Sequence, residues 1–304
     1  MLAEALAPLF FYTLFGVILR AGGIVKAELA STLFRFMFVC TLPALVFTFM
    51  ARAPLGADSI LLPVSGFLTN VGCALAAFLW GRWRGLDERH TGALVLSASI
   101  INMMLMYPFV QFMLGEDGLR YAILFDIGNA VFVSTIASSL AIYFGHEGEV
   151  KPLKSIIEMF KAPIFVALFA ALVVNLGGIE PAPLVFRVTE PLGNATMPLT
   201  LVALGIALSP KALKGPLPVL PIALRMGVGL LLGILLSTLF GMEGLTKWIV
   251  IAGSAAPIGF GTVALTAVGK LDVEYAATAV TLSVTLGLVT ITGLLWLAGR
   301  MAGA

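Results

Sequence analysis

The sequence predicts an all-α polytopic membrane protein with ten transmembrane helices, arranged as two inverted five-helix repeats in which the fourth and ninth helices are broken. Three observations lead to this prediction. The composition is too apolar for a soluble surface, one pattern of residues recurs along the chain, and proline interrupts an apolar segment at a corresponding place in each half.

Hydrophobic residues make up 60% of the 304 residues and charged residues only 11%, and the mean hydropathy is +1.06. An average soluble domain has about 25% charged residues. The chain therefore has too few charges to cover a soluble surface, and we expect it to lie in a lipid bilayer. A net charge of +2, spread over short connections, gives no basic patch for nucleic acid. Cys40 and Cys73 both lie in apolar runs, which favours packing over a disulfide bond or a metal site.

A helix needs about 20 apolar residues to cross a bilayer. On this criterion the ten segments are residues 5–22, 29–51, 60–81, 91–113, 119–144, 156–176, 183–208, 216–240, 246–268 and 275–299. No basic residue precedes the apolar run of the first segment and no convincing cleavage site follows, so we expect a retained span rather than a signal peptide. The longest connection, residues 146–161, is expected to be a partly amphipathic cytoplasmic link.

An internal repeat supports the division into halves. Residues 7–24 and 162–179 both begin with Ala-Pro-X-Phe and both end with Gly-Gly-Ile, at a shift of 155 residues. At the same shift, Pro43 matches Pro198 and Gly72 matches Gly227. The chain therefore divides into a first repeat at residues 1–150 and a second at residues 151–304. Each half holds five spans, and because five is odd, the second half must enter the membrane in the opposite orientation.

The basic residues predict the orientation. Thirteen fall on one side of the predicted topology: Arg20, Lys26, Arg35, Arg82, Arg84, Arg89, Lys151, Lys154, Lys161, Lys211, Lys214, Arg225 and Lys270. Five fall on the other side: Arg52, Arg120, Arg187, Lys247 and Arg300. Cytoplasmic loops carry an excess of Lys and Arg. We therefore expect a multi-pass protein of the cell's inner membrane with both termini extracytoplasmic.

Two interrupted segments, residues 97–108 and 254–262, indicate where the function lies. Proline has no N–H group and clashes with the preceding turn, so Pro108 and Pro257 should kink or unwind their helices. In the first segment we expect the break at Asn102. Backbone groups freed in this way are tolerated at membrane depth only inside protein or beside a wet cavity. Each broken end also presents unpaired N–H groups with a partial positive charge of about half an elementary charge. Such ends suit an anionic substrate, and their place in two inverted repeats favours alternating access.

The candidate substrate-binding residues follow from these interruptions. They are Asn102, Tyr107, Pro108, Ser254, Pro257, Gly259, Gly261 and Thr262. For Asn102 the alternative is an amide that satisfies its own kinked backbone. For the bulky run at residues 103–107 the alternative is simple packing.

Two further polar pairs lie within predicted spans. Asp126 and Asn129 are three residues apart and so share a helix face. An ionisable group in a span is costly and is a functional candidate, so we expect Asp126 to take up a proton during transport or to anchor the crossing region. The alternative is a carboxylate that meets water near a helix end or bonds to Asn129. Asn194 and Thr196 are candidates for the scaffold side of the pathway.

The ten-span plan and its motifs resemble a known family. Asn102 followed by Pro108, Pro257 in the ninth segment, and residues 264–272 leading into Ser283 and Thr285 are similar to a bacterial member of the auxin efflux carrier family, within the bile acid/arsenite/riboflavin transporter superfamily. The resemblance covers essentially the whole chain. It implies a scaffold of segments 1, 2, 6 and 7, and a mobile transport domain of segments 3–5 and 8–10 that moves as an elevator, with the two broken helices crossing inside it.

The same resemblance implies a substrate class and an assembly. Family substrates are organic anions, such as malate or malonate in bacteria and indole-3-acetate in plants, and a homodimer is expected. This chain departs from the family at residues 103–107, where bulky side chains replace the usual small residues. The departure favours a flatter or more apolar anion.

Other classes of function are less well supported. His90 and His146 lie in loops, Asp126 has no second aspartate within a span, and no zinc or P-loop motif occurs, so the sequence favours neither an enzyme nor a bound metal or cofactor. An anion channel, a ligand-sensing membrane protein and a sodium-coupled bile-acid-type symporter stay open as alternatives. The second break contains no acidic residue for a sodium site, so proton coupling or facilitated transport is favoured over sodium.

Overall fold

The computed structural model describes residues 2–146, 152–207 and 218–301. Within these residues the only extended pairing is one isolated antiparallel bridge, between Ile101 and Ile258. The α-helices are α1 (Leu2–Ala21), α2 (Glu28–Phe36), α3 (Leu42–Met50), α4 (Leu61–Trp83), α5 (Glu88–Ser99), α6 (Met103–Phe132), α7 (Ser138–Gly145), α8 (Pro152–Lys161), α9 (Pro163–Leu176), α10 (Pro183–Asn194), α11 (Thr196–Ala207), α12 (Val219–Ile222), α13 (Gly229–Leu239), α14 (Gly244–Ser254), α15 (Gly261–Val268) and α16 (Val273–Met301).

In the part of the chain that the structure describes, three short π-helical segments join consecutive helices without a loop. They are η1 (Met37–Thr41) between α2 and α3, η3 (Val133–Ala137) between α6 and α7, and η5 (Ala223–Val228) between α12 and α13. A 3-10 turn, η2 (Ala57–Ile60), precedes α4. A π-helical turn inserts one extra residue per turn and is frequent at functional sites. All three segments lie beside the site described below.

Helices occupy all ten predicted segments, and several segments are interrupted. Five stretches are long and apolar enough to cross a membrane by length and composition: Glu28–Met50, Leu61–Trp83, Met103–Gly145, Val219–Leu239 and Val273–Met301. Two shorter apolar helices are Ala7–Ala21 and Pro163–Leu176. The predicted seventh segment, expected to be continuous, is divided between α10 and α11 at Ala195. The structure is thus that of an all-helical multi-pass membrane protein.

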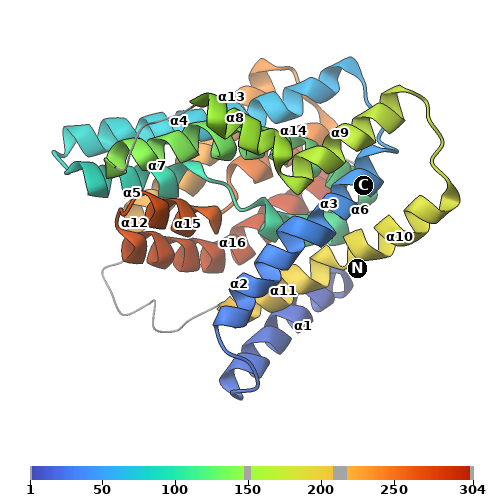
Figure 1. Ribbon diagram of the computed structural model, residues 1–304, viewed down its shortest axis with the longest axis horizontal. Coiled ribbons are helices and arrows are strands. Elements are labelled where there is room, and N and C mark those ends of the chain that lie inside the picture. The colour runs from blue at the N-terminus through green and yellow to red at the C-terminus, as the bar shows by residue number, and fades with distance from the viewer. Residues whose placement is uncertain (1, 147–151, 208–217, 302–304) are drawn as a thin grey trace.

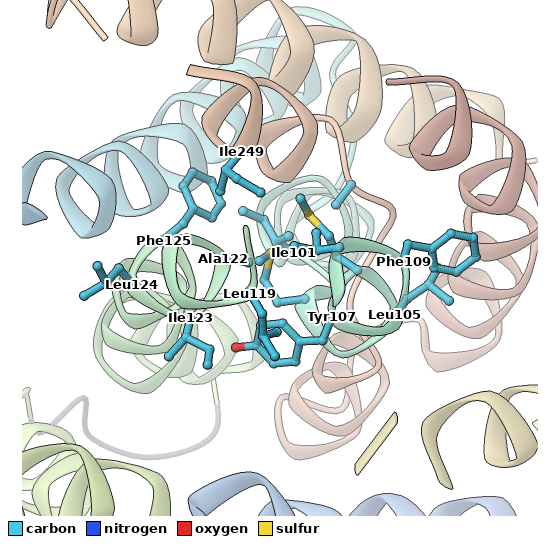
Figure 2. Close-up of a cluster of buried hydrophobic side chains, with 14 of the residues drawn as sticks. Ile101, Leu105, Tyr107, Phe109, Leu119, Ala122, Ile123, Leu124, Phe125 and Ile249 are labelled. Atoms are coloured by element: carbon cyan, nitrogen blue, oxygen red, sulfur yellow. The ribbon is translucent and has the colours of Figure 1, made fainter. Parts of the chain in front are cut away.

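Helix α6 consists of two arms that lie side by side. Gly115 interrupts the helix with φ 71° and ψ −162°, a conformation that glycine adopts without strain. The hydroxyl of Tyr107 on the first arm bonds to Asp126 on the second, although 19 residues of straight helix would separate them by about 28 Å. Figure 2 shows Tyr107 pointing from its own arm toward the arm that carries Leu119 and Ile123.

The helices form two groups that pack mainly among themselves. In Figure 1 the blue and yellow helices α1, α2, α3, α10 and α11 lie together from the lower centre to the right, whereas α4, α5, α7, α12 and α15 lie at the left. Within the first group, α1 packs on α11, and α3 packs on α9 and α10. Within the second, α4 packs on α5 and α6, and α14 packs on α13 and α16. The first group touches the second chiefly through α6.

Glycine permits backbone contact inside each group. A Cβ atom at Gly205 of α11 would lie 2.0 Å from the carbonyl oxygen of Thr13 on α1, and one at Gly193 would lie 2.8 Å from the backbone of Leu45. The small residues of the seventh segment therefore serve contacts within the chain. In the second group, a Cβ atom at Gly128 would lie 1.8 Å from the carbonyl oxygen of Pro63.

Two side-chain contacts join residues that the internal repeat makes equivalent. The Thr196 hydroxyl donates to the Thr41 hydroxyl at 2.8 Å, and Arg225 donates to the Asn70 amide oxygen at 3.4 Å. Each pair is separated by 155 residues, which is the shift of the repeat. Contacts between equivalent positions are what a two-fold axis relating the halves would produce.

Candidate functional site at the crossing of two interrupted helices

The first interruption is made by Asn102 and lies well before the proline. Helix α5 ends at Ser99, and Ile100 adopts extended backbone angles (φ −92°, ψ 122°). The Asn102 side chain accepts a hydrogen bond from Leu105 N at 3.1 Å and so caps the start of α6. Pro108 lies buried inside α6, six residues after Asn102. The break therefore lies at Asn102, where it was expected, and not at the proline itself.

The second interruption contains its proline, as predicted. Helix α14 ends at Ser254 and α15 begins at Gly261, so the six intervening residues, with Pro257 among them, are unwound. Ile258 N donates to the Ser283 hydroxyl on α16 at 3.1 Å. A backbone N–H group that the break leaves without a helical partner is thus satisfied from a neighbouring helix.

The two unwound stretches hydrogen-bond to each other. Asn102 N donates to Pro257 O at 2.9 Å, and Gly259 N donates to Ile100 O at 2.9 Å. A Cβ atom at Gly259 would lie 2.7 Å from the carbonyl oxygen of Ile101, so the close approach requires glycine. The breaks therefore meet at one crossing and supply partners for each other's backbone groups.

A cavity of about 230 Å³ lies at this crossing, between the two helix groups. Its lining comprises Phe38, Leu42, Ile100, Ile101, Asn102, Met103, Met104, Asp126, Asn129, Ala130, Val133, Ser134, Ala162, Ile164, Phe165, Gly259, Phe260 and Gly261. Most of these side chains are apolar, and none is a lysine or arginine. Polar groups come from Asn102, Asp126, Asn129 and Ser134.

Four backbone N–H groups at the cavity have no partner among the described residues. They belong to Met103 and Met104 at the start of α6, and to Phe260 and Gly261 at the start of α15. The first N–H groups of a helix cannot bond within the helix and lie at the positive end of its dipole. Two helix starts thus bring unpaired donors to the same apolar cavity.

A chain of hydrogen bonds leads from the cavity into the protein. The Tyr107 hydroxyl donates to Asp126 Oδ2 at 2.6 Å, and Asn129 Nδ2 donates to Asp126 Oδ1 at 2.7 Å. Asn70 Nδ2 donates to Asn129 Oδ1 at 2.8 Å, and Arg225 Nη1 donates to Asn70 Oδ1. A guanidinium can only donate and an ionised carboxylate can only accept. Arg225 at one end of the chain and Asp126 at the other therefore fix the orientation of the Asn70 and Asn129 amides.

The position of Arg225 corrects the sequence analysis. We counted it among the basic residues of the cytoplasmic side, but it is fully buried at the crossing, where it donates to Ser254 O, Ala98 O and Ser99 O. The count of the basic side therefore falls to twelve against five. Of these twelve, Lys151, Lys211 and Lys214 lie outside the described residues.

Five of the residues singled out from the sequence line the cavity: Asn102, Asp126, Asn129, Gly259 and Gly261. The others do not. Tyr107 does not line the cavity, but its hydroxyl donates to Asp126, which does. Pro257 lies in the crossing, where its carbonyl oxygen accepts from Asn102 N.

The remaining candidates are buried behind the crossing. The Ser254 hydroxyl bonds to Thr69 at 2.9 Å, and its carbonyl accepts from Arg225. Thr262 is buried with a hydroxyl that has no partner among the described residues.

The residues proposed for the scaffold side do not reach the cavity. Asn194 is exposed at the end of α10, and Thr196 is occupied by its bond to Thr41. The first helix group contributes Phe38, Leu42 and Phe165 to the cavity wall, together with Ala162 and Ile164. These side chains are ordinary members of apolar segments, so the sequence offered no signal for them.

Arg225 and Asn70 were also missed, although a signal existed. Each is polar within an apolar segment, and they occupy the same position of the two repeats. An ionisable residue inside a span is a functional candidate. Comparing the repeats for polar residues at shared positions would have found the pair.

No cluster of three or more metal-ligating side chains occurs in the described part of the chain. What the structure does hold is an internal cavity where two interrupted helices of a multi-pass membrane protein cross. This arrangement is typical of membrane transporters.

Comparisons with known proteins agree with this class. Residues 1–295 match the model of a family described as "Membrane transport protein". A protein of Methanothermobacter thermautotrophicus described as an uncharacterized transporter is 28% identical over 293 residues, which is 95% of each chain. Another, from Methanocaldococcus jannaschii, has the same description and is 27% identical over 91% of this chain and 92% of its own. The chain belongs to this membrane transport family, the auxin efflux carrier family.

Proposed function

We propose that the protein is a secondary-active transporter of small organic anions and that the anion binds in the cavity where the broken helices cross. The observation that carries this proposal is the set of four unpaired N–H groups at Met103, Met104, Phe260 and Gly261. Helix starts bind anions through such groups. Asn102 adds a donor, because its amide has two N–H groups and makes only a long 3.5 Å contact with Ile258 O.

The apolar lining narrows the range of substrates. Malate, malonate and auxin-like acids all carry the carboxylate that the helix starts would bind. A second carboxylate would find no lysine or arginine in the cavity and would lie near Asp126. The site therefore favours a monocarboxylate with a flat apolar body over a dicarboxylate.

We further propose an elevator mechanism in which ten helices span the inner membrane and both termini lie outside. The scaffold comprises α1–α3 and α9–α11, and the transport domain comprises α4–α7 and α12–α16. The two helix groups support this division, and the contacts between Thr41 and Thr196 and between Asn70 and Arg225 support inverted repeats. Scaffold helices in a homodimer would anchor the assembly.

The contact that must change during movement lies between the two groups. The ring centroids of Phe34 on α2 and Phe260 in the second break are 4.4 Å apart. Met104 packs in the same hydrophobic cluster. Phe260 and Met104 also line the cavity. A transport domain that slides past the scaffold has to separate these side chains.

Asp126 is proposed to couple transport to protons. It is buried, it lines the cavity, and its two oxygens accept from Tyr107 and Asn129. Protonation would turn one carboxylate oxygen into a donor and force one of these bonds to rearrange. The charge of Asp126 is therefore linked to the orientation of the amides that reach the crossing.

The test is uptake of labelled malate, malonate and indole-3-acetate into proteoliposomes under separately imposed proton and sodium gradients. Wild type is compared with Asn102→Ala in the cavity and with Asn194→Ala, an exposed asparagine at the end of α10, as the matched control. We expect saturable wild-type uptake, strongest for indole-3-acetate, that Asn102→Ala loses and Asn194→Ala keeps.

Other outcomes would contradict the proposal in recognisable ways. Flux that never saturates would indicate an anion channel. Absence of flux from a folded protein that still shows ligand-induced thermal shifts would indicate a sensor. Asp126→Asn with unchanged uptake and unchanged pH dependence would remove proton coupling while leaving the substrate site in place.

A further inference from the structure

The buried Arg225 has no acidic partner. Its side chain is 0% exposed, and no carboxylate forms an ion pair with it in the described ranges. Arginine keeps its charge in proteins, and burial of a charge is costly unless other groups compensate it. The compensation must therefore come from dipoles around the guanidinium.

Those dipoles are the carboxyl-terminal ends of both interrupted helices. Arg225 Nη1 lies 3.4 Å from Ala98 O and 3.5 Å from Ser99 O, at the end of α5. Its Nη2 donates to Ser254 O, at the end of α14. Carbonyls in a last helical turn lack intrahelical partners and form the negative end of the helix dipole. One guanidinium thus covers two negative helix ends.

The local structure is shaped to place the guanidinium there. Arg225 lies on the π-helical segment η5, and Gly229 follows at the start of α13. A Cβ atom at Gly229 would lie 2.7 Å from Arg225 Nη2 and 2.0 Å from Ser254 O. Any larger residue at position 229 would displace either the guanidinium or the end of α14.

In transporters built from broken helices, carboxyl-terminal half-helix ends and unwound carbonyls coordinate the coupling cation, such as sodium. We propose that Arg225 is a resident cation which fills this position at the crossing, so that the protein transports its substrate without sodium. This inference rests on the proposed transport function. It makes Arg225 a positioning residue that neutralises two negative helix ends and leaves the positive ends of α6 and α15 to act on the anion.

The experiment combines flux with chemical rescue in proteoliposomes. Uptake of indole-3-acetate is measured in sodium, potassium or choline medium for wild type, Arg225→Ala and Arg225→Lys. Arg52→Gln is the control for loss of one positive charge, because Arg52 forms a surface pair with Glu190 at 3.6 Å.

Wild-type and Arg52→Gln uptake should be equal in the three media. Arg225→Ala should lose about tenfold or more of its uptake because the carbonyl ends are left uncompensated. Millimolar guanidinium or sodium, which can enter the vacated position, should restore uptake, whereas choline should not. Arg225→Lys should retain part of the uptake and stay indifferent to sodium.

Three results would overturn the proposal: wild-type uptake that requires sodium, Arg225→Ala uptake at the wild-type rate in choline, or a folded Arg225→Ala that no cation restores. The last result would leave Arg225 with a purely structural role. If Arg225→Ala does not fold, the uptake of wild type and Arg225→Lys in sodium medium tests the proposal. A requirement for sodium in wild type would overturn it.

A thermal readout separates this inference from the proposed function. Wild type should unfold at the same temperature in sodium and potassium at equal ionic strength, and Arg225→Ala should be stabilised selectively by sodium or guanidinium. If wild type transports none of the anions, the proposed function fails and the thermal measurement alone decides the role of Arg225. A sodium-specific stabilisation of wild type would contradict it.

Discussion

The two breaks at the crossing are built in different ways. The second, between Ser254 and Gly261, is six residues long, contains Pro257 and begins its new helix without a side-chain cap. The first, between Ser99 and Met103, contains neither proline nor glycine and begins its new helix with the Asn102 cap. Residues that cannot continue a helix enforce the second break locally. The first depends on its cap and on hydrogen bonds from the second.

This difference teaches that one break can impose another. Ile100 and Asn102 exchange backbone hydrogen bonds with Gly259 and Pro257. Nothing in the residue types of 100–102 prevents a helix. Damage to the second break should therefore disturb both, whereas damage to the Asn102 cap should disturb the first break most.

The largest effect should come from the glycine that the crossing requires. In Gly259→Ala, the new Cβ atom would lie 2.7 Å from Ile101 O and 2.9 Å from an Ile100 side-chain carbon. We expect a loss of about 1–3 kcal/mol in the free energy of unfolding and loss of uptake. Gly261→Ala is the matched control, since no atom lies within 4 Å of its added Cβ. Equal thermal stability of the two variants would contradict the requirement for close approach.

Replacing each proline by alanine should distinguish the proline inside a break, Pro257, from the proline inside a helix, Pro108. Pro257→Ala lets α14 extend toward α15 and should reduce uptake by about tenfold, which corresponds to about 1.4 kcal/mol. Pro108→Ala restores an N–H inside α6 and should leave uptake near wild type. Uptake in proteoliposomes measures both. A larger loss in Pro108→Ala would mean that the first break depends on its proline after all.

Two variants can separate the capping role of the Asn102 side-chain oxygen from the donor role of its amide N–H groups. Asn102→Asp keeps an oxygen that accepts from Leu105 N but loses the N–H groups near the cavity, whereas Asn102→Ala loses both. Asn102→Ala should lower the free energy of unfolding by about 1 kcal/mol. Asn102→Asp should keep that stability and still lose uptake, as measured by thermal unfolding beside flux. If Asn102→Asp transports normally, the amide has only its capping role.

The smallest effect should come from the other end of α5. Asp87 caps this helix by accepting from His90 N at 2.8 Å, and this hydrogen bond lowers the pKa of the Asp87 carboxyl below its ordinary value of 3.8. A lowered folded-state pKa contributes stability above the ordinary value, and the contribution is lost as pH falls through the folded-state pKa. Asp87→Asn should therefore change stability by at most about 0.5 kcal/mol near neutral pH.

The pH dependence provides the check on Asp87. Thermal unfolding followed from neutral pH downward should show the difference between wild type and Asp87→Asn shrinking once pH is below 3.8. Asp117→Asn removes a surface pair with Arg120 but no cap, and it serves as the control. A difference that grows in acid would contradict the assigned hydrogen bond.

The sequence located the crossing better than it located the atoms that form it. Periodic apolar segments and repeated prolines are visible in the residue order, so the helices and both interrupted segments could be predicted. The first break was also expected at Asn102, but the hydrogen bonds that hold it could not be predicted, because their partners lie more than 150 positions away. Phe38, Leu42 and Phe165 were missed for a related reason: an apolar side chain beside a cavity has the same residue type as one beside lipid.

The site of Arg225 shows a further limit of sequence reasoning. Arg225 lies inside the predicted span at residues 216–240, and the count of basic residues placed it on the cytoplasmic side. Long cationic side chains usually extend to the interface, but this one is fully buried. Arg225 lies on a π-helical segment, and Gly229 leaves room for its guanidinium beside the end of α14. Neither feature is visible as a pattern in the sequence. The repeat register, which pairs Arg225 with Asn70, is the observation that anticipates its burial.

The backbone bridge between the breaks has a thermodynamic consequence for binding. Because Asn102 N and Gly259 N already have carbonyl partners across the crossing, the unwound segments are ordered before any ligand arrives. Binding to such a preorganised cavity requires little loss of main-chain freedom. Calorimetry should then record a small unfavourable conformational entropy, and the amides of the bridge should exchange slowly with solvent deuterium in both the empty and the loaded protein.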